Sequence, residues 1–553
     1  MSPEKSDRLV SRGEVACVGT IALSYLLVGL VLPIGPNVPL GDSWTFAWSA
    51  RELAEHGRLV LSDGQSMTLV AQLLLAAPAG LLFTATPSVL NLFNFCLSGV
   101  TTVLFFLSFR ALDLPRTTAL LAAGTLAANP IWLAQSVSFD TEISFLFFSA
   151  LGLLALLVWD RGGPRAAIWL SGAAFAAAVL VRQHGIVYAL AGFLYAAWSR
   201  RQRSTVLAAF LLPVAALVGF YAWLHLVHGV PKAFVWSQKI LAVRLSHPVG
   251  LAIASALDLV VSAQYYGLFL IPLLPLAGRV GTLVPARGPR ARAAAGLLVL
   301  LALGTVLATF GFGMVMPSLP NVVTLQAASA PFGIDGPMVG LRIGLTAIAV
   351  ATGAWALLAG LAHAFQSDGA SEGARHFVAA CAALLLAFSL LTGLFFDRYL
   401  LPPLPFLVPL VLPRAVPGRL GVVASTGLLA LVLGFSLFFV DQRIRSSACE
   451  WEVAQALLRE TQDPHRIDGG VAFNGYYSYP WLSKAYGAAQ QDPWPPWVQP
   501  SADLVVRPFA LDDPRVKEID RHRCPNHARL EPFQVFVYRR TIFSGPPLRT
   551  PQG

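Results

Sequence analysis

Charged residues are scarce in this chain: they make up 12% of its 553 residues, about half of the roughly 25% found in soluble domains. Apolar residues account for 56%. So little polar surface excludes a soluble enzyme, and so much apolar surface excludes a disordered chain. The composition therefore predicts a protein that lipid surrounds over most of its surface.

Cysteine is also rare, with five residues, too few for a disulfide scaffold. Cys17, Cys96 and Cys381 lie inside apolar runs and are expected to be small buried hydrophobes. Cys449 and Cys524 lie in the polar C-terminal part. We hypothesise that they form a disulfide if that part lies outside the cytoplasm.

Acidic residues are fewer than basic ones, which gives a net charge of +10. Such an excess can attract nucleic acid or an anionic surface. Here the lysines and arginines cluster in short loops between apolar runs, where they act as orientation signals of a membrane protein. We therefore expect no nucleic-acid partner.

About thirteen apolar runs approach the roughly 20 residues that a membrane-spanning helix needs. We expect a mostly α-helical, polytopic protein. The first run has no small-x-small cleavage site and is expected to remain as an anchor. The predicted spans are 15–32, 88–109, 117–134, 143–159, 166–181, 186–198, 205–228, 251–277, 294–316, 340–362, 377–395, 400–413 and 420–440.

The apolar run Leu69–Phe83 decides the orientation. Counting it as a span would scatter the basic loops over both sides, whereas leaving it out gathers most of them on one side. We therefore predict an interfacial or re-entrant helix within the first outer loop, residues 33–87. The N-terminus is then cytoplasmic, and the chain is a multi-pass protein of the plasma (inner) membrane.

The chain after the last span differs in composition, and we predict two domains: a membrane domain, 1–440, and a small extracytoplasmic α/β domain, 441–553. The second has more turn signals and strand-forming runs. Its expected elements are a helix at Ser447–Arg459, a Trp- and Pro-rich loop at Trp481–Trp497, and strands at Leu504–Pro508 and Pro532–Arg539.

Acidic residues are informative because an unpaired charge is costly in hydrocarbon. Asp42 follows the first span, while Asp140 and Glu142 stand at the entry to the fourth; all are predicted on the outer face. Each alone could be a helix cap or a solvated interfacial group. With Arg182 and Arg398 on the same face, they predict an outward-facing cavity for a charged substrate.

The residues after Asp42 have apolar positions at helical spacing. Trp44, Phe46, Ala47 and Leu53 belong to this apolar set in the segment that ends at His56. The pattern predicts an amphipathic helix that lies along the membrane surface.

The segment Gly41–Gly57 resembles the first outer loop of GT-C superfamily membrane glycosyltransferases, in particular the protein O-mannosyltransferase and lipid A aminoarabinose transferase group. In that group an Asp follows the first span and a helix ends in Leu-x-x-x-Gly, as Leu53–Gly57 does here. Further resemblances are Asn129-Pro130 followed by the acids at 140 and 142, the run Arg398–Pro402, and Ile467–Gly475. Their order is the strongest part of the likeness.

One stretch departs from the lipid A branch, which has a Lys-Pro-Pro-like motif late in this loop. Ser66–Gln72 stands there and contains no lysine. The phosphate must then be bound from elsewhere, and the acceptor can differ.

The resemblance implies that a sugar leaves a polyprenyl-phosphate carrier for an acceptor, with inversion. Asp42 is expected to be the base, and Glu142 the second acid, with Asp140 as its competitor. Arg398, Arg182 and His184 are candidates to bind the donor phosphate. The alternatives are a snorkelling Arg182 and an ordinary interfacial His184.

The expected partners are a polyprenyl-phosphate sugar donor, a lipid, glycan or protein acceptor, and membrane lipids. No His/Cys cluster has zinc spacing, so we expect no metal and no cofactor. The alternative function is a secondary transporter or lipid flippase of the cell envelope. That function would place ionisable residues near the midplane of repeated halves. A weaker third interpretation is an envelope assembly protein.

Overall fold

A computed structural model describes much of the chain, and six of its helices are long and apolar enough to cross a membrane. The described residues are 11–35, 37–198, 202–276, 352–353, 372–391, 397–486, 502–508, 511, 515–524 and 533–540. The six helices are α1 (Arg12–Val31), α4 (Pro87–Ala111), α7 (Thr141–Asp160), α10 (Arg203–Trp223) with its π-helical end η3 (Leu224–His228), α16 (Glu372–Leu391) and α18 (Arg419–Thr461).

The protein is therefore a mostly helical membrane protein. Further helices occupy other predicted spans: α8 (Arg165–Val181), α9 (Val187–Trp198), α12 (Pro248–Leu270) and α17 (Leu404–Val411), the last of only eight residues. The predicted spans 294–316 and 340–362 lie outside the described residues, except for residues 352–353. The total of thirteen spans stays a prediction. Short connecting elements are α11 (Lys232–Ser246), η2 (Gln183–Ile186), η4 (Ile271–Leu276), η7 (Asp397–Leu400) and η8 (Pro464–Arg466).

The predicted span 117–134 is wrong as a single helix. It consists of α5 (Arg116–Ala128) and α6 (Pro130–Ser136), which meet at an angle of 66°. Pro130 has no backbone N–H to continue the helix. Asn129 Oδ1 instead accepts hydrogen bonds from the backbone N–H groups of Ile131 and Trp132, at 2.8 and 3.2 Å. The chain therefore turns and starts a new, capped helix.

Helices α1 and α4 run antiparallel, and the loop between them begins and ends at one end of the bundle. Ser88, at the start of α4, donates to the carbonyl oxygen of Gly35 at 2.6 Å, just after α1. At the other end, Glu14 of α1 pairs with Arg110 of α4 at 3.2 Å. The helix α3 (Val70–Phe83) therefore does not cross between them, which agrees with the predicted interfacial or re-entrant helix.

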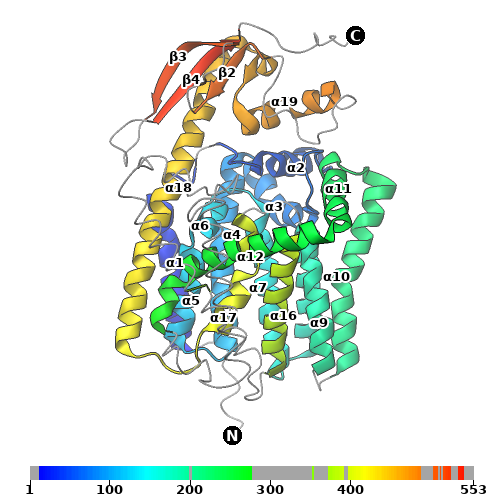
Figure 1. Ribbon diagram of the computed structural model, residues 1–553, viewed down its shortest axis with the longest axis vertical. Helices are drawn as coiled ribbons and strands as arrows, with labels where there is room; N and C mark the ends of the chain where they lie inside the picture. The colour runs from blue at the N-terminus through cyan, green and yellow to red at the C-terminus, as the bar shows by residue number, and fades with distance from the viewer. Residues whose placement is uncertain are drawn as a thin grey trace.

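The amphipathic helix expected after Asp42 is present as α2 (Ser43–His56), with Trp44, Phe46 and Ala47 buried. Figure 1 shows α2 and α3 at the end of the bundle that faces the sheet, opposite the start of α18. We call this the site end. Helices α2 and α3 contact one another along their length.

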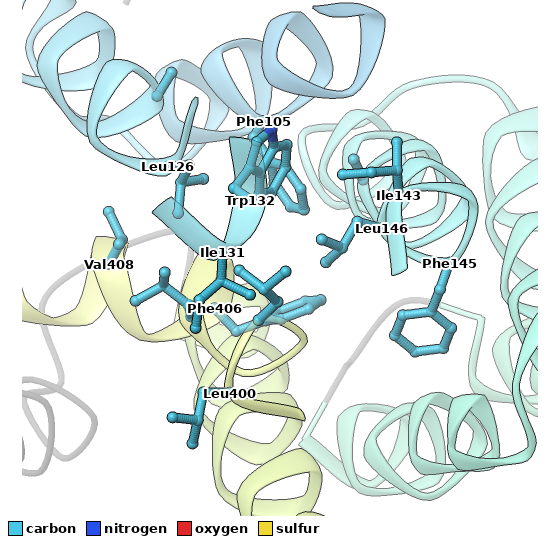
Figure 2. Packing of buried hydrophobic residues seen from close by; sticks show 14 of the residues in the cluster. Phe105, Leu126, Ile131, Trp132, Ile143, Phe145, Leu146, Leu400, Phe406 and Val408 are labelled. Carbon is cyan, nitrogen blue, oxygen red and sulfur yellow. The ribbon is translucent and has the colours of Figure 1, made fainter. Parts of the chain in front are cut away.

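The buried core lies where α4, α6, α7 and the segment around α17 meet (Figure 2). Phe105 of α4 and Trp132 of α6 have ring centroids 6.3 Å apart. Ile143 of α7 and Phe406 of α17 are fully buried nearby. Burial of such side chains in contact with one another fixes the positions of the helix ends that carry the polar site.

The opposite end of the bundle carries ion pairs between four chain segments, and we call it the basic end. Besides the pair of Glu14 with Arg110, Arg161 pairs with Asp113, and Arg414 lies 3.9 Å from the same carboxylate. Arg116 donates to Ser11 at 3.1 Å. These segments are ones that the basic-residue pattern predicted to share one side of the membrane.

Helix α18 joins the membrane part to the C-terminal part without a break. Its 43 residues span about 65 Å at 1.5 Å per residue, twice the roughly 30 Å of the hydrocarbon layer. The boundary that we predicted after residue 440 lies inside it, and the predicted helix Ser447–Arg459 is its final part. Figure 1 shows α18 reaching from the basic end to the sheet.

The C-terminal part contains a four-stranded sheet of order β1-β2-β4-β3. The strands are β1 (Ile467–Asp468), β2 (Leu504–Arg507), β3 (Val516–Cys524) and β4 (Phe533–Arg540). β1 and β2 are parallel and the other pairs antiparallel. β2 and β4 lie where strands were predicted.

Two further expectations for this part have different outcomes. Cys449 of α18 and Cys524 of β3 form a disulfide, with Cα atoms 6.1 Å apart, as hypothesised. The loop predicted from Trp481 is wrong up to Tyr486, because α19 (Gly470–Tyr486) continues through it. The remainder of that loop lies outside the described residues.

Candidate active site

Arg398 joins two acids that are distant in the sequence. Its Nη2 lies 2.9 Å from Asp42 Oδ2, and its Nε lies 3.7 Å from Glu142 Oε1. Arg182 forms a second ion pair with the same Glu142 oxygen. The loop before α2, the start of α7, the end of α8 and η7 therefore meet at the site end. We call Asp42, Asp140, Glu142, Arg182 and Arg398 the acid–arginine cluster.

The members of this cluster differ in their exposure. The side chains of Glu142 and Arg182 are each 1% exposed and that of Arg398 is 8% exposed, whereas that of Asp42 is 26% exposed. Buried charges persist in a fold only when they are paired and hydrogen-bonded. Of these four charged groups, Asp42 is thus the one that a substrate can reach most directly.

Glu142 is held by the first turn of α7, where the helix dipole favours negative charge. Arg182 follows the last residue of α8 in extended conformation and also donates to Thr141 Oγ1 at 2.9 Å. Its guanidinium lies over the Tyr399 ring, 5.2 Å from the centroid. Arg182 therefore points into the protein, not to the membrane surface as a snorkelling residue would.

The Leu53–Gly57 pattern has a local structural reason. Gly57 ends α2 with φ of +65°, and its N–H donates to the carbonyl oxygens of Glu52 and Leu53. This left-handed cap favours glycine. At the other end, Gly41 has φ of +60° directly before Asp42. The loop can therefore turn sharply and present Asp42 beside Arg398.

Asp140 occupies the N-cap position of α7 but makes no capping hydrogen bond. Its Oδ2 instead accepts from Ser138 Oγ at 2.9 Å. Burial, followed by the nearby charge of Glu142, raises the pKa of Asp140 to about 7. The simple helix-cap interpretation is therefore not what the structure has, and this carboxyl can gain or lose a proton near neutral pH.

His184 takes part in no ion pair among the residues that the structure describes. Its ring packs between Phe145 and Phe388, with centroid distances of 5.0 and 5.4 Å. Its Nε2 is buried and makes no hydrogen bond within the described part of the chain. A role in binding the donor phosphate stays a prediction.

Sequence reasoning missed two residues near the cluster. Gln135 is fully buried at the end of α6, close to both Asp140 and Glu142. Arg443, on α18, lies near Gly41, and its charge acts on Asp140. A polar amide inside an apolar run was a usable signal for Gln135; Arg443 lies in a helix that the sequence gives no reason to place here.

The motif Ile467–Gly475 connects the sheet to α2. Asp468, fully buried in β1, pairs with Arg507 at 2.8 Å and accepts from Asn474 at 2.8 Å. A Cβ on Gly475 would overlap the ring of Trp44, so only glycine permits this approach of α19 to α2. The C-terminal part is therefore packed against the helix that follows Asp42.

Comparison with known families identifies part of the chain. Residues 68–226 match the family model described as dolichyl-phosphate-mannose-protein mannosyltransferase. The expected resemblance to this group of GT-C glycosyltransferases is confirmed for that segment, which holds Asp140, Glu142 and Arg182. A search among curated proteins found no match.

Several solved membrane-enzyme structures share a distant likeness with this chain. A S. cerevisiae protein O-mannosyltransferase complex bound to the sugar donor matches 39% of this chain and 34% of its own, with 18% identity and a TM-score of 0.34. The archaeal oligosaccharyltransferase of Archaeoglobus fulgidus, in complex with an inhibitory peptide and a dolichol-phosphate, matches 90% of this chain and 61% of its own, with 12% identity and a TM-score of 0.42. ArnT from Cupriavidus metallidurans matches 96% of this chain and 99% of its own, with 12% identity and a TM-score of 0.38.

Proposed function

We propose that this protein is an inverting glycosyltransferase that moves a sugar from a polyprenyl-phosphate carrier to an acceptor on the outer face of the membrane. The observation that carries the proposal is Arg398 between Asp42 and Glu142. It brings an accessible carboxylate next to buried arginines at the end of a membrane bundle. The family match, whose description names a dolichyl-phosphate sugar, supports a lipid-linked donor.

Each charged group in the proposed reaction has a task. The acceptor hydroxyl needs a base within hydrogen-bond reach, and Asp42 is the most exposed of the three acids. The leaving phosphate needs positive charge, which Arg398 supplies from beside that base, with Arg182 behind it. Glu142 keeps the two guanidinium groups in place. Attack by the activated acceptor on the face opposite the phosphate gives inversion.

The proposed outer location rests on two features. A disulfide between Cys449 and Cys524 is typical of an oxidising compartment outside the cytoplasm. The basic end, with Arg110, Arg161 and Arg414, is the end expected to face the cytoplasm. The site end then faces outward, the N-terminus is cytoplasmic, and the inner membrane of the cell envelope is the proposed location.

The test is transfer by the purified protein in lipid nanodiscs. The protein is incubated with a panel of polyprenyl-phosphate sugars and with extracted envelope lipids, glycans or peptides, and products are analysed by mass spectrometry. The proposal expects loss of one sugar donor and a matching mass gain on one acceptor, both absent with Asp42→Asn. Unchanged donors across a panel of hexose and pentose carriers would refute it. In closed liposomes that contain the same protein, a donor lipid that crosses the bilayer intact would favour the flippase alternative.

A further inference from the structure

Gln135 lies between the two acids at the start of α7. The side-chain amide oxygen and nitrogen of Gln135 both have suitable hydrogen-bond partners when the nitrogen faces the two acids. In this orientation Gln135 donates to Asp140 Oδ2 at 3.0 Å and to Glu142 Oε2 at 3.1 Å. One –NH2 group thus supplies one hydrogen to each carboxylate. All three residues are at most 1% exposed.

The fold holds Gln135 in place from its backbone. Asn94 of α4 donates from Nδ2 to the carbonyl oxygens of Gln135 and Ser138, at 2.9 and 2.6 Å. Asn91, one turn earlier, accepts from the N–H of Phe139 at 3.0 Å. The bend at Asn129 directs α6 toward this turn. Two buried asparagines of α4 therefore fix the turn that carries Gln135 to Asp140.

We propose that Gln135 is a positioning residue that bridges Asp140 and Glu142 and thereby sets the protonation state of Asp140 during sugar transfer. The inference rests on the proposed function for its kinetic consequence only. Two carboxyl groups two residues apart repel one another when both are ionised. A neutral donor shared between them lowers that repulsion and leaves the second oxygen of Glu142 to the arginines.

Other charged and titratable groups also face the two carboxyl groups and act on them together with the bridge. They are Asp42, Arg182, Arg398, Tyr399 and Arg443. The packed faces of α3 and α4 contribute only amides here, Gln72, Asn91 and Asn94. Because hydrogen bonds to an ionised carboxylate favour that form, removing the bridge should raise the pH at which Asp140 releases its proton.

The first experiment compares the pH dependence of transfer in the wild type and Gln135→Met. Methionine keeps the length of the side chain and removes both donors. We expect the acid limb of the profile to move about one pH unit toward alkaline pH. The matched control is Gln65→Met, another buried amide, which bonds to Thr45 and Ser49 of α2. Gln65→Met should leave the pH of the acid limb unchanged. If Gln135 had only a structural role, Gln135→Met would leave it unchanged as well.

The second experiment needs no substrate. Infrared titration of the purified protein follows the carboxylic-acid carbonyl band that disappears in Asp140→Asn. In Gln135→Met its midpoint should lie about one pH unit above that of the wild type. An unmoved band and an unmoved limb would overturn the bridge. If the band shifts in Gln135→Met while the wild type transfers no sugar from any donor, the proposed function is overturned and the bridge stands.

Discussion

The two ends of the helix bundle differ in how exposed their ion pairs are. At the basic end, Asp113 and Arg161 pair with side chains 51% and 44% exposed. At the site end, Glu142 and Arg182 pair with side chains 1% exposed. The first pair is screened by water and contributes little to stability. The second sits where each charge would be costly without its partner.

This difference in exposure supports the proposal that the site end is the functional one. Hydrophobic residues of the same volume would fill the site end at least as stably as a cluster of buried acids and arginines. Such a cluster is therefore expected where chemistry requires it. In the proposed orientation, the basic end, with its exposed pairs, keeps its loops on the cytoplasmic side of the membrane.

The largest effect on the rate of transfer is expected for Asp42→Asn at the site end. The amide cannot accept a proton from an acceptor hydroxyl, so transfer should fall by about 10²- to 10⁴-fold. Asp113→Asn, at the basic end, is the matched control and should retain activity. Initial rates of both purified variants check this. Equal rates for Asp42→Asn and the wild type would remove Asp42 as the base.

Removal of one buried partner should cost stability at the site end. Arg182→Met leaves Glu142 without its closest cation, and we expect a loss of about 3–5 kcal/mol in the free energy of unfolding. Denaturant unfolding in mild detergent measures it. A loss of less than about 1 kcal/mol, as for an exposed pair, would mean that the two ends do not differ as argued.

The disulfide between Cys449 of α18 and Cys524 of β3 should also contribute to the free energy of unfolding. Reduction, or Cys449→Ser with Cys524→Ser, opens a long loop and should lower stability by about 2–4 kcal/mol. Protease accessibility of the sheet, compared in oxidised and reduced protein, reports on it. The matched control is Cys381→Ala, at a free cysteine buried within α16. This substitution should leave the effect of reductant on stability unchanged.

Asp140 predicts a pH dependence of stability at the site end. Its pKa is raised from 3.8 to about 7, so the folded state binds its proton more tightly than the unfolded state. The stabilisation is therefore full below about pH 4 and is lost as the pH rises to 7, at about 1.4 kcal/mol for each pH unit between those two values. Thermal unfolding between pH 4 and 8 should show this slope in the wild type and not in Asp140→Asn.

The smallest effect is expected for Asp113→Asn itself. Loss of its exposed pairs with Arg161 and Arg414 should change the free energy of unfolding by less than about 1 kcal/mol. The same unfolding assay as for Arg182→Met gives the direct comparison. A loss as large as that of Arg182→Met would show that exposure does not separate the two ends.

Local patterns allowed much of the fold to be predicted. Apolar runs located α1, α4 and α7, and the spacing after Asp42 predicted α2 within a residue. Runs of strand-forming residues predicted β2 and β4. These features depend on neighbouring residues, because helix and strand periodicity is local. The bend at Asn129 was missed, although Pro130 marks it, because apolar content alone cannot distinguish one span from two short helices.

The acid–arginine cluster was only partly predictable. Its charged members stood out because charges are rare in apolar sequence, and the resemblance ordered them. Which arginine meets which acid, and the place of Gln135 between two carboxyls, depend on contacts between α6, α7, α8 and η7. Such contacts are nonlocal, and no spacing in the sequence encodes them.

From its sequence alone, this protein had to be a membrane protein with helices of known position and acids at their ends, because the hydrophobic effect acts on each apolar run separately. Only the tertiary structure decided that α18 brings Arg443 close to Gly41 and that α19 packs on Trp44. It also decided that Arg398 joins Asp42 to Glu142. These outcomes depend on how all the helices pack at once, and close packing has no local code.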